Sequence, residues 1–413
     1  MRKFLITLIS FLAILLLAFF GWYFMSGGNG PAPVIESLKN VLPFGSNGND
    51  SDFTATPDTV ASSTVAETEV KPLEDLFNLS NTPVAGSVVF TRNKLEVVRY
   101  VERATGHIFE IVLPSSATST DIIVKNRITN KTLPKIYEAY FRSDGSAVLL
   151  RSLKNNSDTS ENLSLTLTPP NPKASSTDGL HTVSATVLRG DIDSVVTGFG
   201  NTLIYSLKNS GAILSSSFNT LTTQTLLNSP FSNWRLSTAG DSLLVYTKAS
   251  SQAPGYAYRL SGSGLSKVLG PLNGLVALTN LSGTRTLYSY IDRNETKLAA
   301  ITNLGTVTEI SPATIAEKCV WSVKRTSVVI CGAPTNSLST SEPDNWYKGL
   351  SHFSDEIWRF NTDSQIAQIL MQPKDKFGVD LDVMQPKLSP AEDYLIFTNK
   401  NDLSLWALKL EPF

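Results

Sequence analysis

Cysteine and histidine are scarce in this chain, with two and three residues among 413. A Cys/His zinc module needs four ligands close together, and a disulfide-dense small fold needs several cysteine pairs. Charge is also sparse, since charged residues make up 17%, against about 25% in an average soluble protein. The 35 basic and 36 acidic residues leave a net charge of −1, without the cationic footprint of a nucleic-acid binder. These shortages exclude both kinds of cysteine-based fold, and we expect no nucleic-acid partner.

Local signatures of catalysis are missing as well. The chain has no Gly-x-Ser-x-Gly nucleophile elbow, no His-Glu-x-x-His zinc motif and no P-loop. The acidic pairs Asp191/Asp193 and Asp380/Asp382 have the alternating spacing that puts two carboxylates on one strand face, but they lack the further oxygen ligands of a calcium site. We therefore predict no catalytic residue, no metal site and no cofactor, and the sequence favours a non-enzyme.

One long hydrophobic run is present, close to the N-terminus. From Phe4 to Met25 the chain has 22 residues without a charged side chain, enough at 1.5 Å per residue to span a hydrocarbon core of roughly 30 Å. Arg2 and Lys3 precede the run and no basic residue follows until Lys39, which keeps the N-terminus cytoplasmic by the positive-inside rule. A cleaved signal peptide is the alternative, with a usual apolar region of about 7 to 15 residues. We expect residues 1–25 to be an uncleaved signal-anchor of a single-pass membrane protein, and under both interpretations the remaining chain is extracytoplasmic.

Residues 26–72 have a different composition, rich in Gly, Pro, Ser, Asn, Asp and Thr, without apolar periodicity. Such a segment does not bury enough apolar surface to order itself. Six acids against two bases give it a net charge of −4. We expect a flexible acidic linker with a mean reach of about 35 to 40 Å.

Residues 73–413 have the pattern of a repetitive all-β domain. Short blocks of β-branched and aromatic residues follow turns at 86–90, 145–151, 200–206, 240–247, 283–290, 325–331 and 393–399. The block starts are 59, 55, 40, 43, 42 and 68 residues apart, and three of these intervals match the 40 to 45 residues of a four-stranded propeller blade. Helical periodicity is almost absent. The pattern predicts a β-propeller of about seven four-stranded blades, with six or eight as alternatives.

Two of the turns carry a family resemblance. Ser389 and Pro390 precede the apolar run at 394–397, which Leu405-Trp406 follows, and Asp144-Gly145 precede a second run at 147–150. These turns resemble the Ser-Pro-Asp-Gly turn of TolB-type and WD-repeat-like propellers. Most other turns lack the proline and the Asp-Gly pair, and no Gly-His or Trp-Asp signature occurs. The resemblance implies the propeller architecture for residues 73–413 and no particular subfamily.

The last block leaves room for only one further strand before Phe413. A closed ring then needs a strand from elsewhere, and residues 73–80, just after the linker, are the natural donor. Such closure removes exposed sheet edges, which otherwise promote aggregation.

Cys319 and Cys331 lie six residues on either side of Arg325, at the centre of an expected hairpin. In that geometry the two side chains face each other across the ladder, and a disulfide there suits an exported domain. The alternative is a pair of buried free thiols, which behave as small hydrophobes.

The most distinctive insertion lies between residues 335 and 355, in the expected loop between the second and third strands of blade six. It gathers aromatic, histidine and carboxylate side chains: Asp344, Trp346, Tyr347, His352, Phe353 and Asp355. Aromatic side chains on a loop give a large contact area at low entropic cost, so these residues are the candidate partner-binding site. The alternative is that the loop folds back and packs on its own blade.

Two classes of function remain open. The first is a membrane-anchored extracytoplasmic module of the cell envelope that binds a protein, a peptide or a glycan, or that acts as a scaffold. The second is a glycan-active hydrolase or lyase that uses carboxylates in the central channel. Two or more channel carboxylates with raised pKa values favour the enzyme, and their absence favours the binding module.

Overall fold

The computed structural model describes residues 67–69, 75–114, 123–154, 159–171, 179–239, 242–262 and 264–411. The expected membrane anchor and most of the expected linker lie outside these ranges. Within them, no helix has the length and apolarity that crossing a membrane requires. All described strands belong to one compact unit, residues 62–413.

The described strands form six antiparallel sheets, and the seven-stranded one contains two blades, so that there are seven blades of four strands each. Within a blade, the strands are named from the innermost outward. Blade one consists of β3 (Val84–Arg92), β4 (Leu95–Glu102), β5 (Ile108–Val112) and β6 (Ile123–Arg127), with β1 (Glu67–Glu69) added outside β6. Blade two consists of β7 (Glu138–Phe141), β8 (Ala147–Leu153), β9 (Ser160–Thr168) and β10 (Thr182–Leu188). Blade three consists of β11 (Ile192–Thr197), β12 (Thr202–Leu207), β13 (Ala212–Ser217) and β14 (Thr223–Asn228).

Blades four and five share the long strand β18 (Gly264–Thr279), whose first part is the outer strand of one and whose last part is the inner strand of the other. Blade four also contains β15 (Trp234–Ala239), β16 (Ser242–Thr247) and β17 (Pro254–Ser261). Blade five also contains β19 (Arg285–Asp292), β20 (Glu295–Thr302) and β21 (Val307–Ile310).

Blade six consists of β22 (Cys319–Trp321), β23 (Val328–Pro334), β24 (Asp355–Asn361) and β25 (Ile366–Met371). Three short helices flank its strands: η1 (Ala316–Lys318), α3 (Asp344–Lys348) and α4 (Pro373–Phe377). Blade seven consists of β26 (Val383–Leu388), β27 (Tyr394–Asn399), β28 (Leu405–Lys409) and β2 (Leu76–Ser80).

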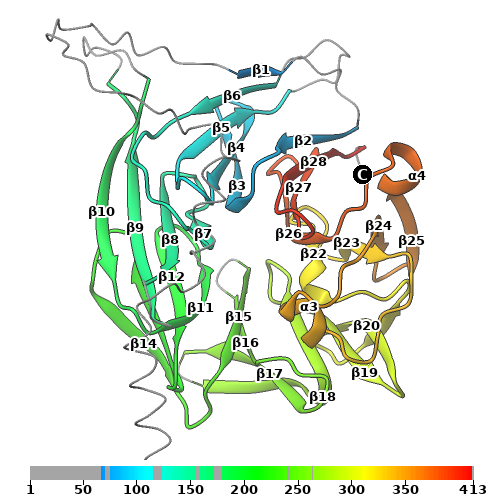
Figure 1. The fold of residues 1–413 in the computed structure, drawn as a ribbon. Coiled ribbons are helices and arrows are strands. Elements are labelled where there is room, and N and C mark those ends of the chain that lie inside the picture. The colour runs from blue at the N-terminus through cyan, green and yellow to red at the C-terminus, as the bar shows by residue number, and fades with distance from the viewer. Residues whose placement is uncertain are drawn as a thin grey trace, which may run out of the picture. The chain divides into compact units, whose positions relative to one another are not determined.

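The innermost strands of neighbouring blades contact one another, with η1 contacting β18 between blades five and six, and β26 of blade seven contacts β3 of blade one (Figure 1). The ring is closed by β2, which pairs with β28 so that Leu76 lies opposite Leu408. The fold is therefore a seven-bladed β-propeller, and the strand at 76–80 confirms the prediction that the ring is closed from the segment after the linker.

Burial explains why the second strands are continuous apolar runs. Every residue of β23 and of β27 is buried, because each sheet packs between two neighbouring sheets. The outer strands β14 and β25 are mostly exposed. The core is accordingly a series of layers between blades, such as the layer in which Val97 and Phe90 of blade one meet Phe141 and Leu150 of blade two.

One detail of the predicted repeat is wrong. The block at 86–90 lies in β3, an innermost strand, whereas the other six blocks form second strands. Blade one places two apolar strands in succession, and β4 is its true second strand.

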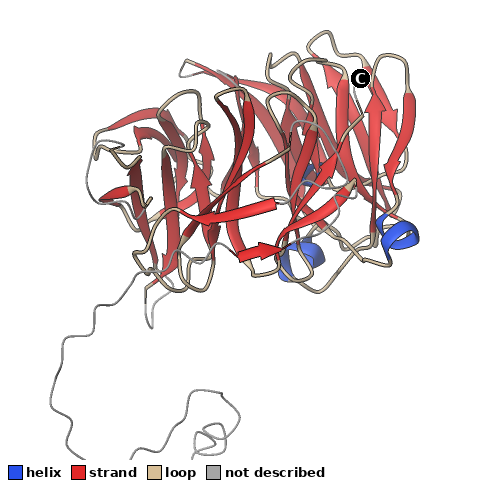
Figure 2. Cartoon of the chain, turned by 90° about the horizontal axis from the view of Figure 1, so that it is seen from above, coloured by secondary structure: helices blue, strands red, loops and turns tan. Residues whose placement is uncertain are grey.

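Because successive strands run antiparallel, the loops between second and third strands emerge on the same face as the connections between blades. We call this the α3 face. Figure 2 shows the helices gathered on one side of the strands. The loop between β23 and β24 and the connection from β25 to β26 both belong to this face.

Candidate functional site

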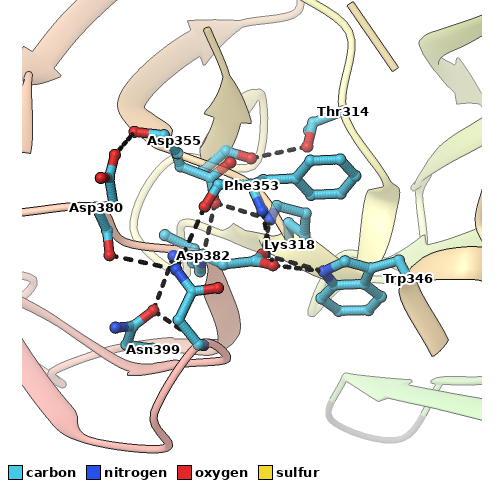
Figure 3. A network of polar contacts seen from close by, with 12 residues as sticks. Thr314, Lys318, Trp346, Phe353, Asp355, Asp380, Asp382 and Asn399 are labelled. Atoms are coloured by element: carbon cyan, nitrogen blue, oxygen red, sulfur yellow. Dashed lines mark hydrogen bonds and ion pairs between the residues drawn. The ribbon is translucent and has the colours of Figure 1, made fainter. Parts of the chain in front are cut away.

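The candidate loop does connect the second and third strands of blade six, and it contains the one-turn helix α3. Gly349 ends this helix in the left-handed conformation, with φ of 71° and backbone bonds back to the helix. The loop lies on a buried polar cluster at the interface between blades six and seven (Figure 3).

A lysine between two aspartates forms the centre of that cluster. Lys318 Nζ lies 2.8 Å from an Asp355 oxygen and also pairs with Asp382, and all three side chains are fully buried. Asp355 Oδ2 accepts the Val383 N–H at 2.7 Å, whereas its Oδ1 has no hydrogen-bond partner among the described residues. Burial raises the pKa of Asp355 to about 6; Lys318 opposes the rise and Asp382 adds to it. We refer to Lys318, Asp355 and Asp382 as the buried triad.

Two of the predicted aromatic contact residues hold the loop to the buried triad. Trp346 is 2% exposed, and its indole N–H lies 3.0 Å from both Asp382 oxygens. The Phe353 N–H donates to Asp382 at 3.2 Å. Lys318 Nζ lies 5.3 Å from the centre of the Trp346 ring and 4.8 Å from that of Phe353. For Trp346, Phe353 and Asp355 these contacts favour the packing alternative over direct partner contact.

The remaining candidates have other surroundings. Asp344 accepts the backbone N–H of Ser251 at 2.5 Å, which ties the loop to blade four. His352 is exposed on the surface. Tyr347 is 45% exposed and lines the central channel, where its hydroxyl donates to Glu317 at 2.6 Å. Of the six candidates, Tyr347 is thus the one that combines exposure with a place in a cavity.

The central channel is a cavity of about 1120 Å³ lined mainly by the innermost strands. Its mouth on the α3 face carries paired charges from successive blades. Glu138 pairs with Arg151 at 2.6 Å, and Asp193 pairs with Arg235 at 2.7 Å. Tyrosines complete this mouth, namely Tyr140, Tyr246 and Tyr347. We refer to this end as the channel mouth.

Glu317 differs from the other carboxylates of the channel mouth because its hydrogen-bond partner is a tyrosine and not an arginine. It precedes Lys318 in η1, so that one side chain faces the channel while the next enters the buried triad. Desolvation by the channel walls raises the pKa of Glu317, which the Tyr347 hydrogen bond and Arg235 partly oppose. The channel carboxylates at Glu138 and Asp193 are instead paired with arginines.

Sequence patterns alone do not reveal this channel mouth. Glu138 is the first residue of β7, and Asp193 and Arg235 are the second residues of β11 and β15. A charged residue at the start of successive innermost strands is a signal that appears only after strands are assigned to blades.

The acidic pairs Asp191/Asp193 and Asp380/Asp382 do not share strand faces as expected, because Asp191 and Asp380 precede their strands. Asp191 pairs with Arg189, and Asp380 pairs with Lys374 at 3.0 Å.

Cys319 and Cys331 are joined by a disulfide bond. They occupy directly opposed positions of the β22–β23 hairpin, as their spacing predicts. The bond fastens a three-residue innermost strand that follows Glu317 and Lys318 in the chain. It thereby supports the segment that supplies both the channel mouth and the buried triad.

No protein family model and no curated protein matches the chain. Solved structures do resemble it. The chain is similar to YCF48 bound to a D1 peptide, with 12% identity, a TM-score of 0.49 and coverage of 85% of this chain and 100% of that one. The chain is also similar to the WD40 repeats of RRP9, with 10% identity, a TM-score of 0.48 and coverage of 84% of this chain and 100% of that one. A third similar structure is TolB from Acinetobacter baumannii, with 11% identity, a TM-score of 0.39 and coverage of 66% of this chain and 62% of that one. At these identities the likeness concerns the fold alone, and the TolB-type and WD-repeat-like propellers suggested by the turns are both among these structures.

Proposed function

We propose that this protein is a binding module that receives an extended peptide segment of a partner protein at the channel mouth. The observation that carries this proposal is the channel mouth itself: a cavity of about 1120 Å³ whose entrance combines tyrosines with charge pairs. Pockets of this size hold several residues of a ligand. Tyrosine supplies a large, rigid contact area, and neighbouring donors and acceptors match the alternating N–H and C=O groups of an extended backbone.

The pairing of the channel charges is the reason to favour binding over glycan cleavage. A glycosidase uses two carboxyl groups as acid and as base or nucleophile. Here Arg151 and Arg235 neutralise Glu138 and Asp193, and Glu317 is held by Tyr347. The buried triad has a carboxyl with a raised pKa, but no substrate reaches a fully buried side chain.

The proposal includes a place in the cell. The apolar run from Phe4 to Met25 would hold the propeller outside the membrane on a tether of about 47 residues, with the N-terminus in the cytoplasm. A disulfide in the propeller is consistent with an oxidising compartment. Full-length protein should stay in the membrane pellet after alkaline carbonate extraction, and release into the supernatant would contradict the anchor.

Site-specific photo-crosslinking tests the binding function. p-Benzoylphenylalanine is placed at position 347 in the full chain, and at position 350 as a matched control, since Leu350 is 71% exposed in the same loop but does not line the channel. Irradiation in native membranes should yield a discrete protein adduct from position 347, reduced by the second substitution Tyr246→Ala. Equal adducts from both positions, or none from 347, would contradict a partner at the channel mouth.

A further inference from the structure

A lysine of blade seven, Lys387, lines the channel away from the channel mouth. Lys387 belongs to β26, and the ladder between β26 and β27 has a bulge between Met384 and Lys387. Gln385, within the bulge, has φ of 51°, a left-handed conformation that few non-glycine residues adopt. Bulges of this kind re-aim side chains next to functional sites. Here residues 385–388 all line the channel.

The described residues around Lys387 include no counter-charge. The innermost strands run from the α3 face to the opposite face, so Lys387, near the end of β26, lies in the far half of the channel. The other described residues that line this half are apolar, hydroxyl-bearing or amide side chains, including Val89, Phe141, Thr197 and Thr238. Within the described part of the chain, Lys387 forms no ion pair and its ammonium donates no hydrogen bond. Lys387 thus lines a half of the channel in which the described residues provide no carboxylate.

An ammonium in such a place is destabilised by the loss of water. Desolvation lowers the pKa of Lys387 to about 8, and no carboxylate opposes this change. An anion brought into the channel would remove the penalty, since a buried charge becomes favourable only when it is paired. The side chain is half-buried and lines the cavity, so a ligand in the channel lies beside it.

We propose that the far half of the channel is a binding site for a carboxylate group of the peptide ligand, with Lys387 as its cationic partner. This inference rests on the proposed function and adds the chemistry of the ligand. A peptide that enters at the channel mouth meets tyrosines and paired charges first, and its carboxylate then reaches the unpaired ammonium. The carboxylate comes either from the C-terminus of the peptide or from an Asp or Glu side chain.

The experiment uses full-length protein in lipid nanodiscs with ¹³C-dimethylated lysines, so that the methyl signal of Lys387 reports its protonation. The probes are acetyl-tetra-alanine with a free C-terminus, its C-terminal amide, and an amidated acetyl peptide in which one alanine is replaced by glutamate. Without probe, the Lys387 signal should titrate near pH 8, below the ordinary lysine value of 10.5. The signal of Lys131, which is exposed and does not line the channel, is the control for effects of the probe on lysines in general. Saturating carboxylate probe should raise that midpoint by at least about one pH unit, equivalent to a tenfold preference for the charged lysine.

The two acid-bearing probes separate the sources of the carboxylate. A shift with the free C-terminus alone indicates terminal recognition, and a shift with the glutamate peptide alone indicates side-chain recognition. Both support the proposal. An equal shift with the fully amidated peptide, or no shift beyond that of Lys131, overturns it.

Variants separate charge from shape. Lys387→Met should weaken binding of the carboxylate probe at least tenfold, Lys387→Arg should keep it within about threefold, and Lys131→Met should leave it unchanged. Loss of binding in Lys387→Arg together with full binding in Lys387→Met would overturn the assignment. Because the crosslinking at position 347 does not depend on Lys387, failure of the carboxylate site and failure of the binding function give different results.

Discussion

Lys318 of η1 and Lys387 of β26 have opposite environments within one fold. Lys318 is fully buried between Asp355 and Asp382, with indole and phenyl rings over its ammonium. Lys387 is half-buried in the channel and has no anionic partner among the described residues. The elements that carry them, η1 and β26, are in contact. A buried charge that is ion-paired within the fold stabilises the structure, whereas a charge without a partner beside a cavity can bind a ligand of opposite charge.

Removing each charge tests this contrast most strongly. Lys318→Met leaves two buried carboxylates without a cation, so the free energy of unfolding should fall by about 3 to 5 kcal/mol. Lys387→Met removes an unpaired, desolvated charge and should leave the free energy of unfolding unchanged or slightly higher. Urea unfolding followed by tryptophan fluorescence measures both variants. A loss of similar size in Lys387→Met would mean that the channel lysine is structural after all.

We expect the disulfide to affect Lys318 and not Lys387. Its sequence separation is 12 residues, and closing a loop of this size stabilises a fold by roughly 3 kcal/mol. Replacing both Cys319 and Cys331 with Ala should lower the melting temperature. It should also loosen β22, the strand that directly follows Lys318 and helps to hold it in the buried triad. The titration midpoint of Lys387 should not move. Thermal unfolding with and without reductant provides the control, because reductant should lower the melting temperature of the wild type and leave that of the double variant unchanged.

The fold was largely predictable because it depends on local patterns. The run from Val328 to Pro334 is apolar throughout since both faces of its strand are buried, and a count of strands pointed to an N-terminal donor for the ring. The position of the candidate loop followed from its place between two such runs. These predictions need only neighbours in sequence or a count of repeats.

The chemistry of the loop was not predictable in the same way. Trp346 belongs to an aromatic loop segment, yet its partner Asp382 is 36 residues away. Lys318 and Asp382 are 64 residues apart, and nothing in either sequence neighbourhood indicates the other. Their meeting depends on the packing of blade six against blade seven. The channel mouth likewise combines residues at the first or second positions of strands from different blades.

The pH dependence of stability sharpens the description of the buried triad. The pKa of Asp355 is raised to about 6 in the folded protein, above its ordinary value of 3.8. Between these two values the folded state binds more protons than the unfolded state, so stability should rise as the pH falls from 7 toward 4. The slope from this group is at most about 1.4 kcal/mol per pH unit.

Asp355→Asn is the matching variant, because a neutral amide imitates the protonated acid. The variant should lose this part of the pH dependence, as measured by urea unfolding at pH 7, 6 and 5. Asp382→Asn should instead be strongly destabilised at every pH, since Asp382 accepts bonds from Lys318, Trp346 and Phe353. If both variants show the wild-type slope, Asp355 is not the titrating member of the triad.

The smallest expected effect separates the two adjacent aromatic residues of α3. Tyr347→Phe removes one hydrogen bond at a partly exposed site, so the free energy of unfolding should change by less than about 1 kcal/mol. The same hydrogen bond lowers the pKa of Glu317, and its loss should therefore raise that pKa further. Trp346→Phe removes the indole donor from Asp382 and should affect stability without moving the pKa of Glu317. NMR titration of ¹³C-labelled glutamate measures the first effect and urea unfolding the second. If Tyr347→Phe changes only the pKa of Glu317 and Trp346→Phe changes only the stability, α3 contributes one side chain to the channel mouth and the other to the buried triad. If both variants change both quantities, the channel mouth and the buried triad form a single structural network.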